Sequence, residues 1–215
     1  MRARLKVCCI QSVAEAHLAI SHGASAVGLV ARMPSGPGPI SDEQIAEIAA
    51  HCPPPIATFL LTSRTDPDGI VDHVLRTAVN TVQLVDAVDP RAYAALRHAA
   101  PWVRIVQVIH VQGEHSVREA LRLESHVDAL LLDSGRPSAA VKELGGTGRT
   151  HDWDLSARIV REARRPVFLA GGLNPGNVAR ALDSVGPYGI DLCSGIRTGG
   201  ALDPEKLAAL VAAMR

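Results

Sequence analysis

The chain has 215 residues, of which 47% are apolar, so it is long enough to bury the core of one domain. Its 22 basic and 22 acidic residues give a formal net charge of zero, and only 3% of its residues are aromatic. Nucleic-acid-binding proteins usually show a basic excess and stacking aromatics, so no nucleic-acid partner is expected. No stretch of 18 uncharged apolar residues occurs, which predicts no membrane span, and the short first apolar run predicts a cytoplasmic protein without a signal peptide.

Short apolar runs alternate with longer amphipathic stretches along the whole chain. In chain order, the runs expected to form strands are residues 5–10, 26–31, 56–61, 81–85, 103–111, 129–133, 167–170 and 189–193. Runs of this length rich in Val, Ile and Leu favour buried strands over helices. The expected helix starts between them are Ser12, Ser41, Asp66, Asp89 and Asp203, the last three each followed by proline.

Eight such strand–helix units, at about 27 residues each, predict one domain over residues 1–215 with the (β/α)₈ TIM-barrel fold. A doubly wound open sheet is the competing fold, but it would need fewer strands or a longer chain, and no G-x-G-x-x-G follows the first strand. The segments 33–39 and 134–150 are predicted loops after the second and sixth strands. Long loops in these positions lie on the active face of a barrel.

Glycine-rich turns follow the sixth, seventh and eighth predicted strands. Their residues are Gly145, Gly146, Thr147, Gly148, Gly171, Gly172, Ser194 and Gly195. Such turns can expose backbone N–H groups to an anion, and barrels often bind phosphate after strands seven and eight. The second turn is also expected to run straight into a helix, whose N-terminus would favour an anion. Three such turns on one rim predict a phosphate site. For any one turn alone, the glycines could serve only to allow a tight turn.

Two side chains are candidates for acid–base chemistry. Asp133 ends the sixth strand beside an apolar run, where burial would raise its pKa toward the range of a general acid, unless it only caps a turn. Lys6 and Cys8 share one face of the first strand, with Cys9 on the other face. A Lys6 ammonium inside the barrel would favour a Cys8 thiolate that could act as base or nucleophile, the alternative being a structural cysteine.

The other cysteines and the histidines do not form a metal-binding pattern. No C-x-x-C, H-x-x-x-H or H-E-x-x-H spacing occurs, so no metal site is predicted. The four cysteines are expected to be free thiols in a reducing cytosol, and Cys8 and Cys9 have poor geometry for pairing with each other. His110 is the histidine best placed to reach the site, whereas His73 is among those expected at the surface.

Four motifs, in order along nearly the whole chain, resemble phosphoribosylanthranilate isomerase of tryptophan biosynthesis. They are residues 6–8 (KVC), 145–153 (GGTGRTHDW), 170–178 (AGGLNPGNV) and 191–196 (DLCSGI). The resemblance implies a cofactor-free barrel that performs an Amadori rearrangement on a phosphorylated sugar, with Asp133 as general acid and Cys8 as general base. It also implies that the glycine turns hold the phosphate. Further candidates for substrate binding are Lys6, Gln83, Asp191 and Arg32.

The sequence departs from the family pattern at positions near the expected aglycone. Cys9, Gly38 and Val85 stand where the family usually has glycine, an arginine thought to hold the anthranilate carboxylate, and histidine. The family Val-Glu after Ser194-Gly195 is replaced by Ile196-Arg197. Arg32, Arg136 or Arg197 could replace the missing arginine.

Three functions therefore stay open. They are the isomerisation of phosphoribosylanthranilate, the same isomerisation of an N-linked phosphoribosyl substrate without the carboxylate, and phosphate-ligand binding without catalysis. Members of the family occur as monomers and dimers, so either a monomer or a homodimer is expected.

Overall fold

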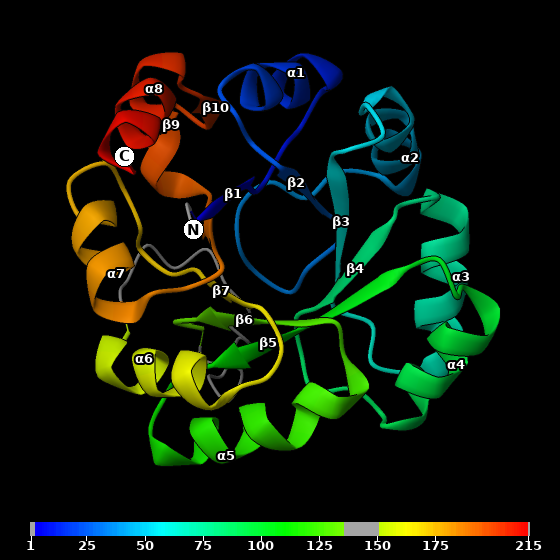
Figure 1. Ribbon diagram of the computed structural model, residues 1–215. Coiled ribbons are helices and arrows are strands. Elements are labelled where there is room, and N and C mark those ends of the chain that lie inside the picture. Colours follow the sequence, from blue (N-terminus) through cyan, green and yellow to red (C-terminus); the bar gives the residue numbers. More distant parts are fainter. Residues whose placement is uncertain (1–2, 136–150, 215) are drawn as a thin grey trace.

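Eight parallel strands close into a barrel in the computed structural model, which describes residues 3–135 and 151–214 (Figure 1). The strands are β1 (Arg4–Val7), β2 (Ala26–Val30), β3 (Ala57–Thr62), β4 (Thr81–Leu84), β5 (Arg104–His110), β6 (Ala129–Asp133), β7 (Val167–Leu169) and β8 (Gly189–Leu192). Each strand pairs with its neighbours in chain order, and β1 pairs with β8 to close the ring. The barrel fold and all eight predicted strands are confirmed.

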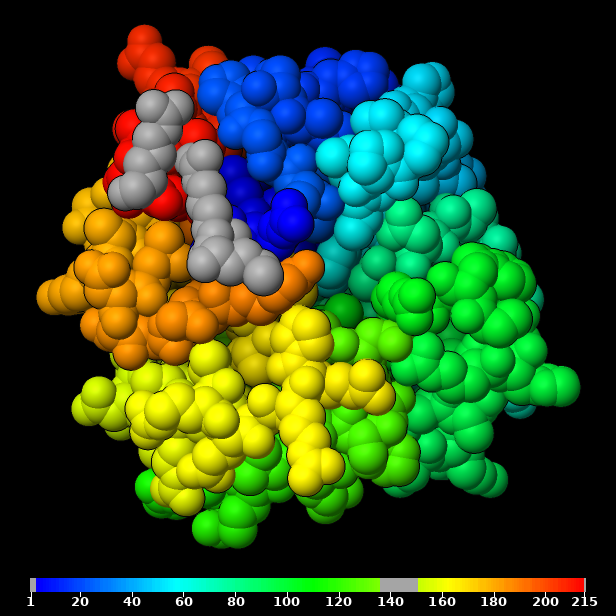
Figure 2. Space-filling model, viewed as in Figure 1, coloured from blue at the N-terminus to red at the C-terminus, as the bar shows by residue number. Residues whose placement is uncertain are grey.

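Helices follow the strands and form the outer ring of the molecule (Figure 1), and the same sequence of colours runs around the edge of the space-filling view (Figure 2). They are α1 (Val13–Ser21), α2 (Asp42–His51), α3 (Pro67–Thr77), α4 (Arg91–Ala99), α5 (Glu114–Leu123), α6 (Trp153–Glu162), α7 (Val178–Val185) and α8 (Pro204–Ala213). The side chains of Ser12, Ser41, Asp66 and Asp203 accept backbone N–H groups in the first turns, as their positions predicted. At α4 the helix begins one residue later than expected, with Pro90 at the cap.

The apolar core has two layers, because side chains of a barrel strand alternate between the interior and the helices. The outer layer lies between strands and helices and contains fully buried residues such as Leu60 and Ile105. The inner layer fills the barrel, where the rings of Phe59 and Phe168 meet edge to face at 6.0 Å. A Cβ at Gly189 would lie 2.7 Å from the Phe168 ring, so glycine is needed there for the interior to pack.

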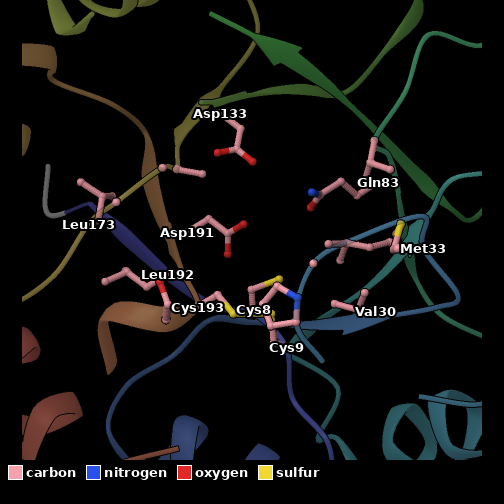
Figure 3. A pocket seen from close by; sticks show the side chains of 18 of the residues that line it. Cys8, Cys9, Val30, Met33, Gln83, Asp133, Leu173, Asp191, Leu192 and Cys193 are labelled. Carbon is pink, nitrogen blue, oxygen red and sulfur yellow. A yellow bond between two sulfur atoms is a disulfide. The ribbon is translucent and has the colours of Figure 1, made fainter. Parts of the chain in front are cut away.

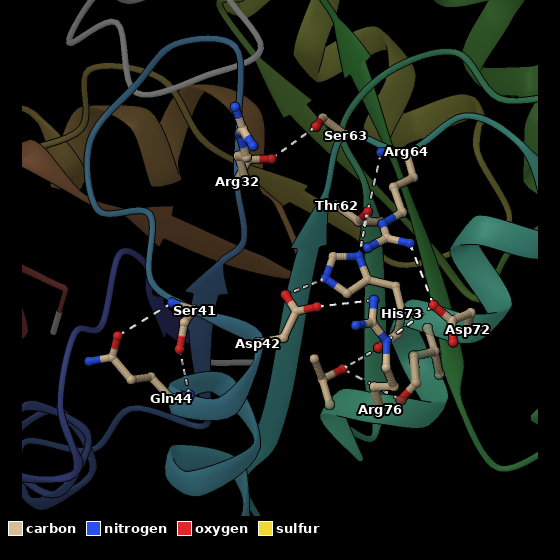
Figure 4. A network of polar contacts seen from close by, with 12 residues as sticks. Arg32, Ser41, Asp42, Gln44, Thr62, Ser63, Arg64, Asp72, His73 and Arg76 are labelled. Carbon is tan, nitrogen blue, oxygen red and sulfur yellow. Dashed lines mark hydrogen bonds and ion pairs between the residues drawn. The ribbon is translucent and has the colours of Figure 1, made fainter.

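A polar network joins α2 to α3 on the outside of the barrel (Figure 4). His73 is 3% exposed, and its ring nitrogens contact Thr62 Oγ1 at 2.9 Å and Asp42 Oδ1 at 3.0 Å. Burial lowers the pKa of His73 despite the Asp42 carboxylate. The expectation of a surface histidine is therefore wrong, because α3 turns this position inward against β3.

A short hairpin between β8 and α8 was not predicted. The strands β9 (Arg197–Thr198) and β10 (Ala201–Leu202) pair antiparallel across Gly199 and Gly200, after the 3₁₀ turn η2 (Ser194–Ile196). Two-residue strands carry too little alternation to be read from a sequence. A second 3₁₀ turn, η1 (Glu124–His126), follows α5. Within the described residues, no helix is both long and apolar enough to cross a membrane.

Candidate active site

A cavity of about 80 Å³ opens among the carboxyl ends of the strands and the loops that follow them (Figure 3). The β2–α2 loop contributes Met33, Ser35, Gly36 and Pro37 to its wall, so this predicted loop lies at the site. The candidates that line the cavity are Cys8, Gln83, Asp133, Gly171, Gly172, Asp191 and Ser194. This is the face on which (β/α)₈ enzymes carry their active sites.

Asp133 ends β6 and points into the cavity (Figure 3). Its side chain is 7% exposed and accepts the Ser134 backbone N–H at 2.7 Å. Burial raises the pKa of Asp133, with a further contribution from the nearby Asp191, while the Ser134 N–H and His110 oppose the shift. The expected rise is therefore present, and it favours a carboxyl group that keeps a proton to donate.

Lys6 lies inside the barrel below the cavity and is completely buried. Its Nζ donates to Asp191 Oδ2 at 2.8 Å, and it lies 5.0 Å from the centre of the Phe59 ring. Burial would lower the pKa of Lys6, but Asp191 and Cys8 raise it further than burial lowers it. Burial raises the pKa of Asp191 although Lys6 opposes this. The raised pKa values of Lys6 and Asp191 both favour a proton held between the two side chains. The 2.8 Å distance from Nζ to Oδ2 fits a Lys6 ammonium that donates to an Asp191 carboxylate.

Cys8 follows β1 and is a free, buried thiol. Glycine at position 28 makes room for it, because a Cβ there would lie 2.7 Å from the Cys8 sulfur and 3.1 Å from Lys6 Nζ. Burial raises the pKa of Cys8 from 9.0 to about 11, against the opposing effect of Lys6. Lys6 lowers this pKa and so favours the thiolate, as expected, but burial has the larger effect and the neutral thiol is the favoured form. The Lys6 charge is shared with Asp191, and the desolvation of Cys8 outweighs what remains.

The Cys8 thiol should titrate only near pH 11. Because its pKa is raised, the neutral thiol is the favoured form below that pH, and thiolate appears as the pH rises through about 11. The measurement is the ultraviolet absorbance of thiolate during a pH titration of the parent and of Cys8→Ser. The difference between the two curves isolates Cys8 from the half-buried Cys52. A midpoint near 9 or lower in the difference curve would contradict the burial argument.

Cys9 and Cys193 form a disulfide, with their Cα atoms 5.9 Å apart. The expectation of four free thiols is corrected for this pair, because closure of the barrel places the end of β1 beside the end of β8. The prediction that Cys9 faces away from Cys8 is also wrong, since both residues line the cavity. β1 ends at Val7, and Cys9 has a left-handed backbone with φ of +61°, so strand alternation no longer applies.

The glycine turns after β7 and β8 lie against each other at one side of the cavity. Gly171 and Gly172 have φ values of +86° and +64°, and a Cβ at Gly195 would lie 2.1 Å from the Leu173 carbonyl oxygen. The turn does not run straight into a helix. α7 begins only at Val178, because Asn174 and Asn177 first form a turn in which both side-chain amides donate to the Gly172 carbonyl. Gly145, Gly146, Thr147 and Gly148 lie outside the described residues.

The opposite wall of the cavity is largely apolar and contains Val30, Met33, Leu61 and Val85. Two buried side-chain oxygens, Gln83 Oε1 in β4 and Asp191 Oδ1 in β8, have no hydrogen-bond partner among the described residues. Such atoms are usually satisfied in a native protein, so they are natural partners for substrate hydroxyl or amine groups. His110 lies beside Asp133 in the β5–β6 pairing and contacts the Val85 carbonyl oxygen at 3.0 Å through Nε2.

The structure locates the arginines that could replace the one missing at Gly38. Arg32 is exposed and does not line the cavity, and Arg136 lies outside the described residues. Arg197 is bound to Glu15 and to backbone carbonyls. Gly38 itself approaches Cys9 so closely that a Cβ there would lie 2.7 Å from the Cys9 Cβ. The sequence showed the change at Arg197 but gave no sign of its partner Glu15.

The fold and the site together define a (β/α)₈ barrel enzyme with a buried carboxyl and a buried thiol in one cavity at the carboxyl ends of its strands. Residues 5–213 match the family model of N-(5'-phosphoribosyl)anthranilate isomerase. The chain therefore belongs to this family of isomerases.

Individual relatives agree with the family model. N-(5'-phosphoribosyl)anthranilate isomerase 2 of Methanosarcina mazei is 37% identical over 94% of this chain and 89% of its own length. The structure of the isomerase from Thermococcus kodakaraensis aligns with a TM-score of 0.83 at 27% identity, over 99% of both chains. A phosphoribosyl anthranilate isomerase in complex with reduced 1-(o-carboxyphenylamino)-1-deoxyribulose 5-phosphate aligns with a TM-score of 0.79 at 27% identity, over 99% of this chain and 98% of that one.

Proposed function

We propose that this chain isomerises N-(5'-phosphoribosyl)anthranilate to the corresponding 1-deoxyribulose 5-phosphate, using general acid–base catalysis without a cofactor. The observation that carries the proposal is the placement of Asp133 and Cys8 in one cavity with the glycine turns after β7 and β8. The phosphate would bind at Gly171, Gly172 and Ser194, where backbone N–H groups can face an anion. Its binding energy would orient the ribose carbons toward the acid and the base.

The reaction would begin with proton transfer from the Asp133 carboxyl to the ribose ring oxygen. The ring C–O bond breaks, and the nitrogen lone pair forms a Schiff base at C1'. Cys8 thiolate then removes the proton from C2', which gives an enolamine that tautomerises to the ketone. Gln83 and Asp191 would bind the ribose hydroxyl groups through the buried oxygens that lack partners among the described residues. No atom is gained or lost overall, as an isomerisation requires.

The scheme requires particular protonation states of Asp133 and Cys8, whose pKa values are both raised. The productive form has a protonated Asp133 and a deprotonated Cys8, although the pKa of the Cys8 thiol is about 11. If the pKa of Asp133 lies below that of Cys8, only a small fraction of the enzyme has protonated Asp133 together with Cys8 thiolate. This fraction is constant at every pH between the two pKa values. The rate would then fall below the pKa of Asp133 and above that of Cys8.

A second candidate substrate class is favoured by the composition of the cavity wall. Among the described residues that line the cavity there is no arginine or lysine, and Gly38 stands where the family arginine is expected. Loss of a charge-assisted contact to the anthranilate carboxylate would cost about 1.5–3 kcal/mol. The same chemistry could therefore act on an N-linked phosphoribosyl substrate that lacks the carboxylate.

A paired turnover assay separates these functions. Freshly prepared N-(5'-phosphoribosyl)anthranilate and its aniline analogue are compared at equal concentration, following the loss of substrate fluorescence. The proposed function predicts a higher kcat/KM for the anthranilate substrate. Equal or faster turnover of the aniline analogue would favour the second class. Binding of phosphorylated substrate without turnover of either compound would point to a barrel that has lost catalysis.

A further inference from the structure

The residues that follow β1 keep hydrogen bonds to the neighbouring barrel strands through their backbone N–H groups. β1 ends at Val7, the Cys8 N–H donates to the Leu192 carbonyl at 2.7 Å, and the Ile10 N–H donates to the Gly28 carbonyl at 3.0 Å. The carbonyl oxygens of Cys8 and Cys9 instead face Arg197. Its Nη2 donates to the Cys9 oxygen and lies 3.5 Å from the Cys8 oxygen.

This peptide has a backbone that is costly to hold. Cys9 has φ of +61°, and the left-handed conformation is unfavourable for a residue with a Cβ because the Cβ comes too close to the following carbonyl oxygen. A conformation of this kind persists only when its surroundings fix it. Arg197 on its carbonyl side and the bond to Cys193 on its side chain both restrain Cys9.

The guanidinium is itself held in place by the half-buried carboxylate of Glu15. Arg197 Nη1 and Nη2 each donate to one oxygen of the Glu15 carboxylate at 3.0 Å, which is the two-point geometry of a strong pair. The Arg197 and Glu15 side chains are 7% and 16% exposed. Glu15 also accepts the Leu202 N–H at 2.8 Å and the Gln11 N–H at 3.0 Å. These contacts join α1 and the β9–β10 hairpin to the peptide of Cys8 and Cys9.

We propose that the Glu15–Arg197 pair positions Cys8. Arg197 makes the contacts to the Cys8 and Cys9 peptide, and Glu15 holds Arg197 in place. Arg197 sets the direction of the Cys8 thiol through the carbonyls of Cys8 and Cys9, without touching the substrate. The catalytic reading of this role rests on the function proposed above. A glycine at position 9 would need such a restraint less, since glycine takes the left-handed backbone without this cost.

The first test is the kinetics of Arg197→Ala. We expect kcat to fall by about 10- to 100-fold with KM changed by no more than about twofold, because a misplaced base affects the chemical step and not phosphate binding. Added guanidinium chloride, at concentrations far below those that unfold proteins, should restore part of kcat with saturation. The control is Lys206→Ala, which removes the 2.8 Å bond from Lys206 Nζ to the Arg197 carbonyl but leaves the guanidinium in place. Its kcat should stay near that of the parent.

The second test does not depend on turnover. Alkylation of Cys8 by iodoacetamide is followed by mass spectrometry of the Cys8 peptide in the parent, in Arg197→Ala and in Lys206→Ala. We expect faster alkylation in Arg197→Ala alone, with guanidinium slowing it again. If Arg197→Ala does not fold, Arg197→Lys keeps the charge without the two-point fork and should show smaller changes of the same sign.

Any of three results would overturn the positioning role. The first is an Arg197→Ala variant that folds and keeps the parental kcat and alkylation rate. The second is a variant in which only KM changes. The third is a variant whose changes in kcat and in alkylation rate are not reversed by guanidinium. If the parent turns over neither substrate but Arg197→Ala is alkylated faster than the parent, the proposed function is refuted. The positioning of Cys8 by Arg197 is then still supported.

Discussion

Replacement of Asp133 by asparagine is expected to lower kcat by about 10²- to 10⁴-fold. Asparagine keeps the shape of the side chain but has no carboxyl proton to give to the ribose ring oxygen. The raised pKa of Asp133 shows that its neutral form suits this site, so the uncharged amide should be tolerated in the fold. The measurement is kcat on N-(5'-phosphoribosyl)anthranilate, together with the melting temperature of parent and variant.

A suitable control is Asp154→Asn, because Asp154 is an exposed carboxylate in the first turn of α6, outside the cavity lining. It should leave kcat unchanged. An Asp133→Asn enzyme that retains near-parental kcat with unchanged melting temperature would remove Asp133 from the mechanism. Loss of activity accompanied by unfolding would instead identify Asp133 as structural.

The sequence was sufficient for the strands because a parallel barrel buries both faces of every strand. Runs such as residues 129–133 are therefore apolar throughout, with a polar residue only at the rim, and their length separates them from helices. The place of Asp133 at the rim follows from the same reasoning, since it is the last residue of such a run. These properties are local, so they can be predicted from the composition and length of each apolar run.

The contacts that shape the Cys8 side of the cavity are not local. Cys9 and Cys193 are separated by 184 residues, and Glu15 and Arg197 by 182. Only closure of the barrel brings these residues together, and no periodic pattern reports which side chains then meet. The left-handed backbone at Cys9 is equally hidden, because a cysteine gives no sign that it takes a conformation usual for glycine.

Charge states were the least accessible part of the site. The residues Lys6 and Cys8 were correctly expected to lie close together, but the effect on the thiol depends on a third group. Asp191 takes up the Lys6 ammonium at 2.8 Å, and burial then decides the pKa of Cys8. A one-dimensional pattern can place an ion near a thiol, yet the balance of desolvation and pairing exists only in three dimensions.

The other large effect is expected at Lys6, which pairs with Asp191 in the barrel interior. Lys6→Met should lower the free energy of unfolding by about 3–5 kcal/mol at neutral pH, because removal of one partner leaves a buried carboxylate without compensation. The pKa of Asp191 is already raised by burial and would rise further without Lys6. The loss should therefore shrink as the pH falls and Asp191 takes up a proton. Denaturant unfolding of parent and variant at several pH values measures this.

The double variant Lys6→Met with Asp191→Asn distinguishes loss of the ion pair from loss of packing. The neutral amide removes the stranded charge, so the double variant should be more stable than Lys6→Met alone at neutral pH, while the two should converge in acid. Lys6 also lies against the Phe59 ring, but a methionine retains most of that apolar contact. A pH-independent loss, equal in the single and double variants, would mean that Lys6 stabilises the barrel by filling space and not by its charge.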